Sequence, residues 1–354
     1  MSGISMQRGR VREFGITIGR FPTGPHNAIT DVPGVAIGHV TLIEGARIRT
    51  GATAILPHGG NLHQEKIPAG LAILNGYGKL AGATQVLELG EIETPIILTN
   101  TLAVGRAIEA VNRWTLAQDG NARVTSVNAV VGETNDSRLN DIRAGRPSVE
   151  EILQAIDCAA TGPVAEGAVG AGTGTVAFGV KGGIGTASRR IGDHHLGVLV
   201  QSNFGGVLRI DGHTLPEGDP TRDVDGSIMI VAATDAPLAD RNLRRLAARC
   251  FGGLARTGAA LSNGSGDYAL AFSTAESQRR TPARRRFLAD YAELSNEAAS
   301  PYFEAAIEAT EEAILNSLFM AGDMTGFDTA KGREASVAAL ALGALPITAV
   351  RAAP

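Results

Sequence analysis

The chain has 354 residues, enough for one large domain or two smaller ones. Its 32 Lys and Arg side chains nearly balance 36 Asp and Glu, which leaves a formal net charge of -4. A charge this small excludes a strong field of one sign, so we expect neither nucleic acid nor a membrane as a partner. The 45 glycines and the 4% aromatic share predict an aliphatic, Ala-rich core.

The sequence is typical of a cytoplasmic protein. No N-terminal stretch resembles a signal peptide, and no window approaches about 18 uninterrupted apolar residues. Cys158 and Cys250 lie far apart in the sequence. They could pair, but they cannot make a disulfide scaffold, and this cysteine usage fits a reducing compartment.

In the first part of the chain, strands are the main prediction. Residues 1–25 are polar and punctuated by Gly and Pro, which predicts an arm packed on the body of the protein. Residues 28–42 alternate and predict a strand with a turn at 33–34. Apolar runs predict further strands at 53–58, 70–75, 95–100 and 124–133.

Helical spacing predicts a helix over 103–117, and a capping box of Ser148 with Glu151 predicts another to about residue 159. Residues 162–190 are rich in Gly, and a helix would lose about 1 kcal/mol for each Gly relative to Ala. We expect two strands there, with a turn at 181–183.

The polar segment 211–226 predicts an exposed loop. Because strands and helices occur in blocks, we expect stacked sheets with helices outside. The remaining predicted elements are strands at 195–205, 227–237 and 267–274, and helices at 238–253, 287–297, 301–320 and 331–343.

The junction Asp225-Gly226-Ser227 joins a polar loop directly to a buried strand. If the bond before Ser227 were cut, Ser227 would carry a free α-amino group with a reference pKa of about 7.7–8, which suits a general base. One residue would then supply both nucleophile and base. Gly226 would tolerate the backbone strain that attack on its carbonyl requires. The dipeptide is common, so alone it indicates an ordinary loop-to-strand junction.

Four other residues could support such chemistry, and each also has a plain structural interpretation. Asn203 ends a predicted strand, where its amide could donate to an oxyanion or cap a turn. Ser265 and Asp267 could orient a nucleophile or form a turn into a strand. Glu133 could hold a substrate ammonium or be a surface charge.

Motifs for metals, nucleotides and nucleic acids are weak. The glycines of 170–174 do not open a helix as G-x-G-x-x-G does. His58, His63 and the pair 194–195 lack the spacing of a zinc site, so we expect no metal and no cofactor. The basic run 279–286 has no interleaved aromatic residues and indicates a solvated loop.

Long blocks of the sequence also occur in an order that points to one family. They are NAITDVPGVAIGHVT (27–41), TGATAILPH (50–58), LNGYGKL (74–80), TPIILTNTLAVG (94–105), VVGETNDSRLNDIR (130–143), VGAGTGTVAFGVKGGIGTASR (169–189), GVLVQSNFG (197–205), DGSIMIVAATDAPL (225–238) and GLARTGAALSNGSGDYALAFST (253–274). Together they resemble the DmpA-like family of β-peptidyl aminopeptidases and L-aminopeptidase/D-esterases. So many blocks are far more specific than one motif and outweigh the plain interpretations.

This resemblance implies the fold class and the processing. The expected fold is α+β, a four-layer αββα sandwich that resembles the N-terminal-nucleophile hydrolases but has different connectivity. A single catalytic domain, 1–354, would cut itself between Gly226 and Ser227. The products would be an α-chain 1–226 and a β-chain 227–354, assembled as a homotetramer of αβ units.

The resemblance also assigns the site residues. Ser227 matches the nucleophile, and Asn203 matches the oxyanion donor. Ser265 and Asp267 match the Ser-x-acid pair beside the nucleophile, with Asp where some members have Glu. Glu133 matches the carboxylate that holds the free amino group of the substrate.

One departure from the family concerns Arg138. Some members carry Tyr at this position, so a phenol hydroxyl is replaced here by a permanent cation. The change puts the substrate preference in question but leaves the nucleophile in place. We therefore count Arg138 among the substrate-binding candidates.

We expect a self-processing serine aminopeptidase that acts on short peptides, amides or esters with a free amino group, through an acyl-enzyme on Ser227. Either its own α-amine or the Ser265–Asp267 pair would take the proton. The ornithine acetyltransferases have a related fold but use Thr, for which this chain has no matching junction. The alternative is an uncleaved, non-catalytic protein that binds ligands or partners in the same cleft, and Arg138 supports it.

Overall fold

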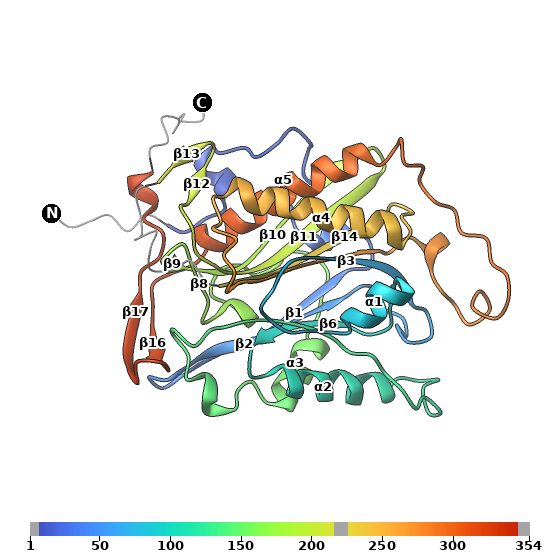
Figure 1. Ribbon diagram of the computed structural model, residues 1–354, viewed down its shortest axis with the longest axis horizontal. Helices are drawn as coiled ribbons and strands as arrows, with labels where there is room; N and C mark the ends of the chain where they lie inside the picture. Colours follow the sequence, from blue (N-terminus) through green and yellow to red (C-terminus); the bar gives the residue numbers. More distant parts are fainter. Residues whose placement is uncertain (1–6, 216–225, 346–354) are drawn as a thin grey trace.

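The computed structural model describes residues 7–215 and 226–345, and two β-sheets lie face to face within them (Figure 1). The first sheet has the order β1-β2-β6-β7-β4, and the second has the order β10-β11-β14-β15-β3-β5. Each contains a parallel pair, β6 with β7 and β14 with β15. The strands are β1 (Ala36–Glu44), β2 (Ile48–Leu56), β6 (Ile96–Asn100), β7 (Val130–Thr134) and β4 (Leu80–Ala81) in the first sheet, and β10 (Gly183–Ile191), β11 (His194–Asn203), β14 (Ser227–Thr234), β15 (Gly266–Ser273), β3 (Ile67–Gly76) and β5 (Glu91–Ile92) in the second.

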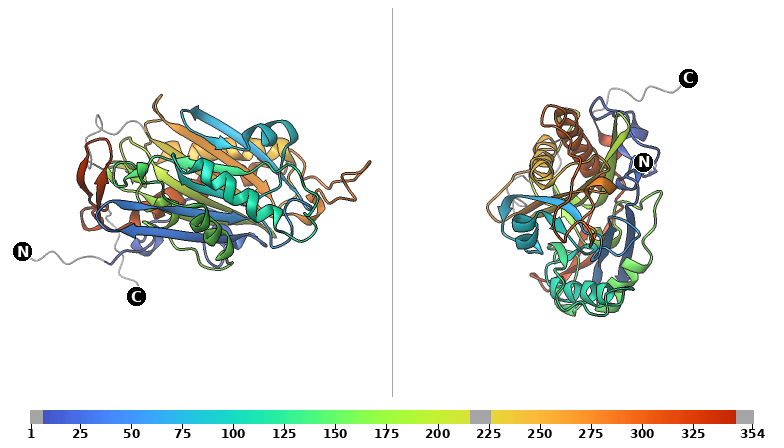
Figure 2. Two further views of the ribbon diagram at one scale, coloured as in Figure 1. Left: turned by 90° about the horizontal axis from the view of Figure 1, so that it is seen from below. Right: turned by 90° about the vertical axis from the view of Figure 1, so that its right-hand side faces the viewer.

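Helices cover the outer face of each sheet, which gives the layer order αββα (Figures 1 and 2). The helices are α1 (Ala83–Leu89), α2 (Val104–Leu116), α3 (Val149–Asp157), α4 (Asp240–Arg256) and α5 (Ser300–Phe319). α2 and α3 pack on the first sheet, whereas α4 and α5 pack on the second. Met229 and Val231 of β14 lie in the core between the sheets, with Ile55 and Leu98 opposite. The predicted four-layer α+β sandwich is confirmed.

Burial on both faces explains the apolar strands. All eight residues of β14 are buried, as expected for a strand covered on both sides. No helix in the described ranges is long and apolar enough to cross a membrane. Cys158 is exposed and Cys250 is buried, and both are free thiols.

Shorter elements connect these layers. Two-residue strands form two small hairpins, and a longer hairpin follows α5. Their bounds are β8 (Val176–Ala177), β9 (Val180–Lys181), β12 (Arg209–Ile210), β13 (His213–Thr214), β16 (Met324–Asp328) and β17 (Arg333–Val337). Turns of 3₁₀ helix span Val11–Phe14, Ile29–Asp31, Ile142–Ala144, Gly170–Gly172, Glu276–Gln278 and Leu342–Ala344.

Several elements predicted from local pattern are confirmed. β11 ends at Asn203, as predicted. The helix at 103–117 is α2, shortened by one residue at each end. The N–H of Glu151 donates to Ser148 Oγ at 3.2 Å, and the Ser148 N–H donates to Glu151 Oε2 at 2.7 Å, so the predicted capping box is present.

Two predicted helices are wrong. Residues 287–297 form no helix, and Phe287 is 100% exposed and Leu288 82% exposed, so these apolar side chains have no surface to pack against. Residues 331–343 form β17 and a 3₁₀ turn instead of a helix. Gly332 has a positive φ of 64°, which lets the chain turn back as the β16–β17 hairpin.

Three predicted strands begin late or are replaced. A 3₁₀ turn occupies the start of the strand predicted at 28–42, so β1 begins only at Ala36. The strand predicted at 124–133 is β7, which begins only at Val130. In 162–190 the second predicted strand forms as β10, whereas the first is replaced by a 3₁₀ turn and the short β8–β9 hairpin, because the chain there folds tightly. A Cβ on Gly172 would lie 2.4 Å from the Ile184 nitrogen, a distance that no side chain tolerates. The predicted loop 211–226 lies largely outside the described residues.

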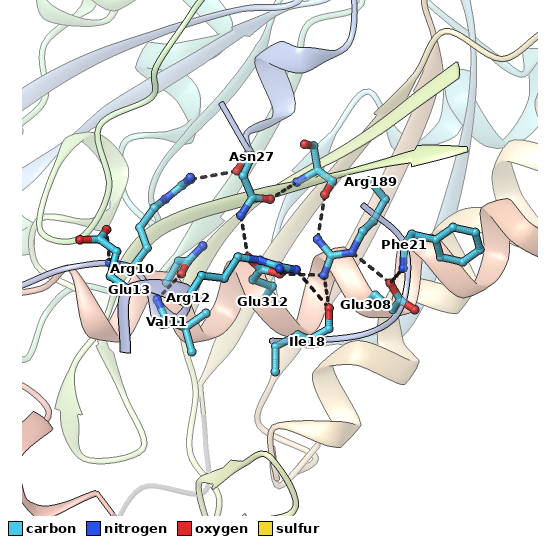
Figure 3. A network of polar contacts seen from close by, with 12 residues as sticks. Arg10, Val11, Arg12, Glu13, Ile18, Phe21, Asn27, Arg189, Glu308 and Glu312 are labelled. Atoms are coloured by element: carbon cyan, nitrogen blue, oxygen red, sulfur yellow. Dashed lines mark hydrogen bonds and ion pairs between the residues drawn. The ribbon is translucent and has the colours of Figure 1, made fainter. Parts of the chain in front are cut away.

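A buried ion network fastens the N-terminal arm to α5, as the sequence predicted for an arm packed on the body (Figure 3). The Arg189 side chain is fully buried and donates to Glu308 Oε2 at 3.0 Å and to Glu312 Oε2 at 2.7 Å. Arg12 of the arm donates to Glu312 Oε1 at 2.6 Å. Burial alone would raise the pKa of Glu312, but the hydrogen bond from Arg12 and the charge of Arg189 hold that pKa below its usual value.

Candidate active site

Three strands of the second sheet bring the candidate residues together at one end. Ser227 is the first residue of β14 and lies opposite Asn203, the last residue of the antiparallel β11. On its other side Ser227 lies opposite Gly266, the first residue of the parallel β15. Residues far apart in the sequence therefore meet because of strand register.

The Ser227 hydroxyl lies against the peptide bond that precedes it. Its Oγ donates to the Gly226 carbonyl oxygen at 2.7 Å and accepts the Gly266 N–H at 3.3 Å. The same N–H also donates to the Gly226 carbonyl oxygen at 3.1 Å. A backbone donor is thus placed at the carbonyl that the hydroxyl would have to attack.

The Asn203 amide is held in one orientation. Its Oδ1 accepts the Val176 N–H at 3.0 Å, so Nδ2 is the end of the amide that remains a donor. Asn203 is largely buried and lines the same cavity as Ser227. This orientation suits an amide that donates to an oxyanion.

Ser265 and Asp267 form a buried, hydrogen-bonded pair. Ser265 Oγ donates to Asp267 Oδ1 at 2.6 Å, and Asn75 Nδ2 donates to Asp267 Oδ2 at 2.8 Å. Burial raises the pKa of Asp267, and the two hydrogen bonds oppose that rise only in part. The pair flanks Gly266, whose N–H contacts Ser227 Oγ.

Glu133 lies at the end of β7 and points into the cavity with partners that the sequence did not reveal. Its Oε1 accepts the Lys79 N–H at 2.9 Å, and its Oε2 accepts a short hydrogen bond from Thr101 Oγ1. Lys79 Nζ lies 3.9 Å from the same carboxylate. Glu133 is only 3% exposed, and it lines the cavity.

The cavity has a volume of about 630 Å³ and joins these groups in one space. Its walls therefore carry a nucleophile candidate, an amide donor, a carboxylate and two cations. The lining residues are Tyr77, Lys79, Thr101, Glu133, Asn135, Ser137, Arg138, Val176, Asn203, Phe204, Gly226, Ser227, Asn263 and Gly264. No group of three or more His, Cys, Asp or Glu residues that could hold a metal ion occurs among the described residues.

Residues 27–332 match the family model described as peptidase family S58. The chain belongs to that family. It is therefore a peptidase, and the predicted resemblance is confirmed.

Named relatives support the same assignment. The chain is 40% identical over 350 residues to the β-peptidyl aminopeptidase BapA of Sphingosinicella microcystinivorans, covering 90% of this chain and 87% of that protein. The solved structure of the PH0078 protein from Pyrococcus horikoshii OT3 is similar, with 46% identity, a TM-score of 0.86, and coverage of 94% of this chain and 96% of that one.

A further structure connects the fold to a class of hydrolase. It is the L-aminopeptidase D-Ala-esterase/amidase from Ochrobactrum anthropi, described as a prototype for the serine aminopeptidases and a variant of the Ntn-hydrolase fold. It shares 36% identity with this chain at a TM-score of 0.84, and the match covers 94% of this chain and 95% of that one. The predicted likeness to the N-terminal-nucleophile hydrolases is thereby confirmed.

Proposed function

We propose that this peptidase is a self-processing serine aminopeptidase. It would remove the N-terminal residue from short peptides, amides or esters that carry a free amino group. The observation that carries the proposal is the position of Ser227, at the first residue of β14, between Asn203 and Gly266 and facing the same cavity as Glu133.

Self-cleavage would begin with the Ser227 hydroxyl attacking the Gly226 carbonyl carbon. The Oγ–C bond forms, the Gly226–Ser227 C–N bond breaks, and the proton passes from Oγ to the leaving amine. The Gly266 N–H, which donates to the Gly226 oxygen, would stabilise the charge on that oxygen. Water then hydrolyses the ester and releases an α-chain 1–226 and a β-chain 227–354.

Turnover would use the same hydroxyl on a substrate carbonyl. The new α-amine of Ser227, with a reference pKa of about 7.7–8, or the Ser265–Asp267 pair would accept the proton. Asn203 Nδ2 would donate to the oxyanion of the tetrahedral intermediate. The proton then goes to the leaving amine, and water hydrolyses the acyl-enzyme.

Recognition of the substrate would rest on charge. Glu133 would bind the ammonium of the substrate, because its carboxylate is buried at the cavity wall near Ser227. Arg138, which lines the same cavity, would favour substrates that carry a negative charge. From the family resemblance we also propose that the protein assembles as a tetramer of αβ units, and from its cysteine usage that it is cytoplasmic.

Denaturing mass spectrometry of the wild type and of Ser227→Ala tests the proposal. The wild type should give two masses that divide the chain between Gly226 and Ser227, and Ser227→Ala should give one. Ser137→Ala is the matched control, because Ser137 also lines the cavity, and it should still cleave.

A free-amine p-nitroanilide and its N-acetylated form provide the second measurement. The cleaved wild type should hydrolyse only the free amine, and Ser227→Ala should hydrolyse neither. Turnover by an intact Ser227→Ala chain would overturn the mechanism. A wild type that stays whole and inactive would favour the non-catalytic binding protein.

A further inference from the structure

Lys181 is a fully buried cation whose hydrogen bonds all go to the backbone. Its side chain has no exposed surface, and its Nζ donates to the carbonyl oxygens of Gly172, Thr175 and Gly182 at 2.9, 2.8 and 2.7 Å. Burying a charge is costly unless hydrogen bonds compensate it, and here every N–H of the ammonium has an acceptor. A neutral amine has only two N–H groups and could not make these three bonds.

One of those acceptors belongs to the peptide unit that holds Asn203. The Thr175 carbonyl oxygen accepts from Lys181, and the N–H of the same peptide unit belongs to Val176 and donates to Asn203 Oδ1. Hydrogen bonds therefore connect the Lys181 ammonium to the Thr175–Val176 peptide, and that peptide to the Asn203 side-chain amide. Hydrogen bonds in such a series polarise one another, so a positive charge at one end strengthens the donor at the other.

The surroundings keep this peptide unit in place. The Gly182 N–H also donates to the Thr175 oxygen at 3.1 Å, and a Cβ on Gly174 would lie 2.9 Å from the Cβ of Asp136. Asp136 is almost fully buried, and its negative charge opposes the effect of burial on Lys181. Burial lowers the pKa of Lys181 to about 7, whereas the three carbonyl acceptors favour the charged form.

We propose that Lys181 is a positioning residue for the oxyanion donor. Its ammonium orients and polarises the Thr175–Val176 peptide, which fixes the Asn203 amide with Nδ2 available to the cavity. The inference rests on the proposed function, because it assumes that Asn203 stabilises an oxyanion. Lys181 contacts no substrate, so its effect must pass through Asn203.

A double-mutant cycle of Lys181→Met and Asn203→Ala tests this dependence. The kinetic constants are measured per cleaved chain, with the cleaved fraction taken from mass spectrometry. Asn203→Ala should lower kcat by roughly 10²- to 10³-fold, and Lys181→Met should lower it by less but by roughly tenfold or more, with KM nearly unchanged. In the Asn203→Ala background, Lys181→Met should cause almost no further loss.

Lys66→Met is the matched control. Lys66 is another largely buried lysine, but it pairs with Glu91 and Glu93. Its loss should lower the melting temperature and leave kcat per folded, cleaved enzyme unchanged. If Lys181→Met does not fold, Lys181→Gln replaces it in the cycle, because Gln keeps hydrogen-bond donors but carries no charge.

The outcomes separate this inference from the proposed function. If Lys181→Met lowers kcat by the same factor in the wild type and in Asn203→Ala, the proposed role of Lys181 is overturned. A rise in KM with kcat unchanged would overturn it as well. If Asn203→Ala alone keeps full activity, the oxyanion role of Asn203 in the proposed function fails, and the inference fails with it. A loss from Asn203→Ala but none from Lys181→Met or Lys181→Gln would overturn only the inference.

Discussion

The ion network on α5 and the cluster of Ser265, Asp267 and Asn75 at the start of β15 are both polar and largely buried, but their groups are paired differently. In the network, Arg189 is fully buried between Glu308 and Glu312, so opposite charges face one another. In the cluster, the carboxylate of Asp267 accepts from the neutral Ser265 and Asn75. In the ion network, the charged groups form their hydrogen bonds with one another. In the cluster, the Asp267 carboxylate stays close to the cavity as a base that the proposed reaction could use.

Replacing Asp267 with Asn should affect activity most. The amide removes the negative charge, and by analogy with the Asp of a catalytic triad we expect a fall in kcat of roughly 10³- to 10⁴-fold with little change in melting temperature. Steady-state kinetics and a thermal melt check this. Asp141→Asn makes the same change in an ion pair with Arg47 and should keep full activity. A fully active Asp267→Asn would contradict the comparison.

Replacing Arg189 with Met should affect stability instead. The change leaves Glu308 and Glu312 buried without this partner, and breaking a buried ion pair typically costs about 3–5 kcal/mol. Denaturant unfolding measures the loss, and kcat per folded molecule should stay the same. Arg20→Met is the control, because it removes an exposed pair with Glu304 on the same helix and should leave stability unchanged. If Arg189→Met and Arg20→Met lower the free energy of unfolding equally, the buried ion network does not have this stabilising role.

The pH dependence of turnover should reveal the raised pKa of Asp267. Burial favours the protonated acid, but the Ser265–Asp267 pair can accept the proton of Ser227 only when Asp267 is ionised. As the pH falls through that raised pKa, activity should therefore be lost at a pH above the usual Asp value of about 3.9. The profile of kcat against pH measures this limb. A limb at or below the usual value would show that the raised pKa of Asp267 does not limit turnover.

Replacing Arg138 with Tyr should have the smallest effect, confined to substrate preference. Loss of the cation should raise KM about tenfold, or about 1.4 kcal/mol, for a peptide with a free C-terminal carboxylate. The same peptide with an amidated C-terminus is the matched substrate, and its KM should change little. A peptide with an acidic first residue shows whether Arg138 selects a carboxylate on the side chain of that residue instead of the C-terminal carboxylate. Equal changes for all three would exclude a charge-selective role.

Local sequence patterns predict the site residues that lie at the ends of strands. Asn203 ends an apolar run and Ser227 begins one, so both could be placed from the sequence. Their meeting depends on the register of three strands, for which the family resemblance was needed.

Other parts of the site could not be predicted because their partners are distant in the sequence or come from the backbone. Thr101 bonds to Glu133 because β6 and β7 are parallel neighbours, which local spacing does not reveal. Lys181 looked like part of a glycine-rich turn, and its three partners are carbonyl oxygens, which carry no side-chain signature. The apolar side chains near Phe287 suggested a helix, but a helix there would lack a surface on which to bury them.

The strand order of the second sheet makes the proposed cut unusual. β14 and β15 lie after residue 226, yet they occupy the middle of a sheet whose flanking strands, β11 and β3, lie before it. Pulling the two products apart would open four strand edges at once, and open edges promote aggregation. The shorter product would have no flanking strands and the longer one a gap in its centre. The proposed cut would therefore divide the covalent chain without dividing the folding unit, and two separately synthesised pieces would not be equivalent to the nicked protein.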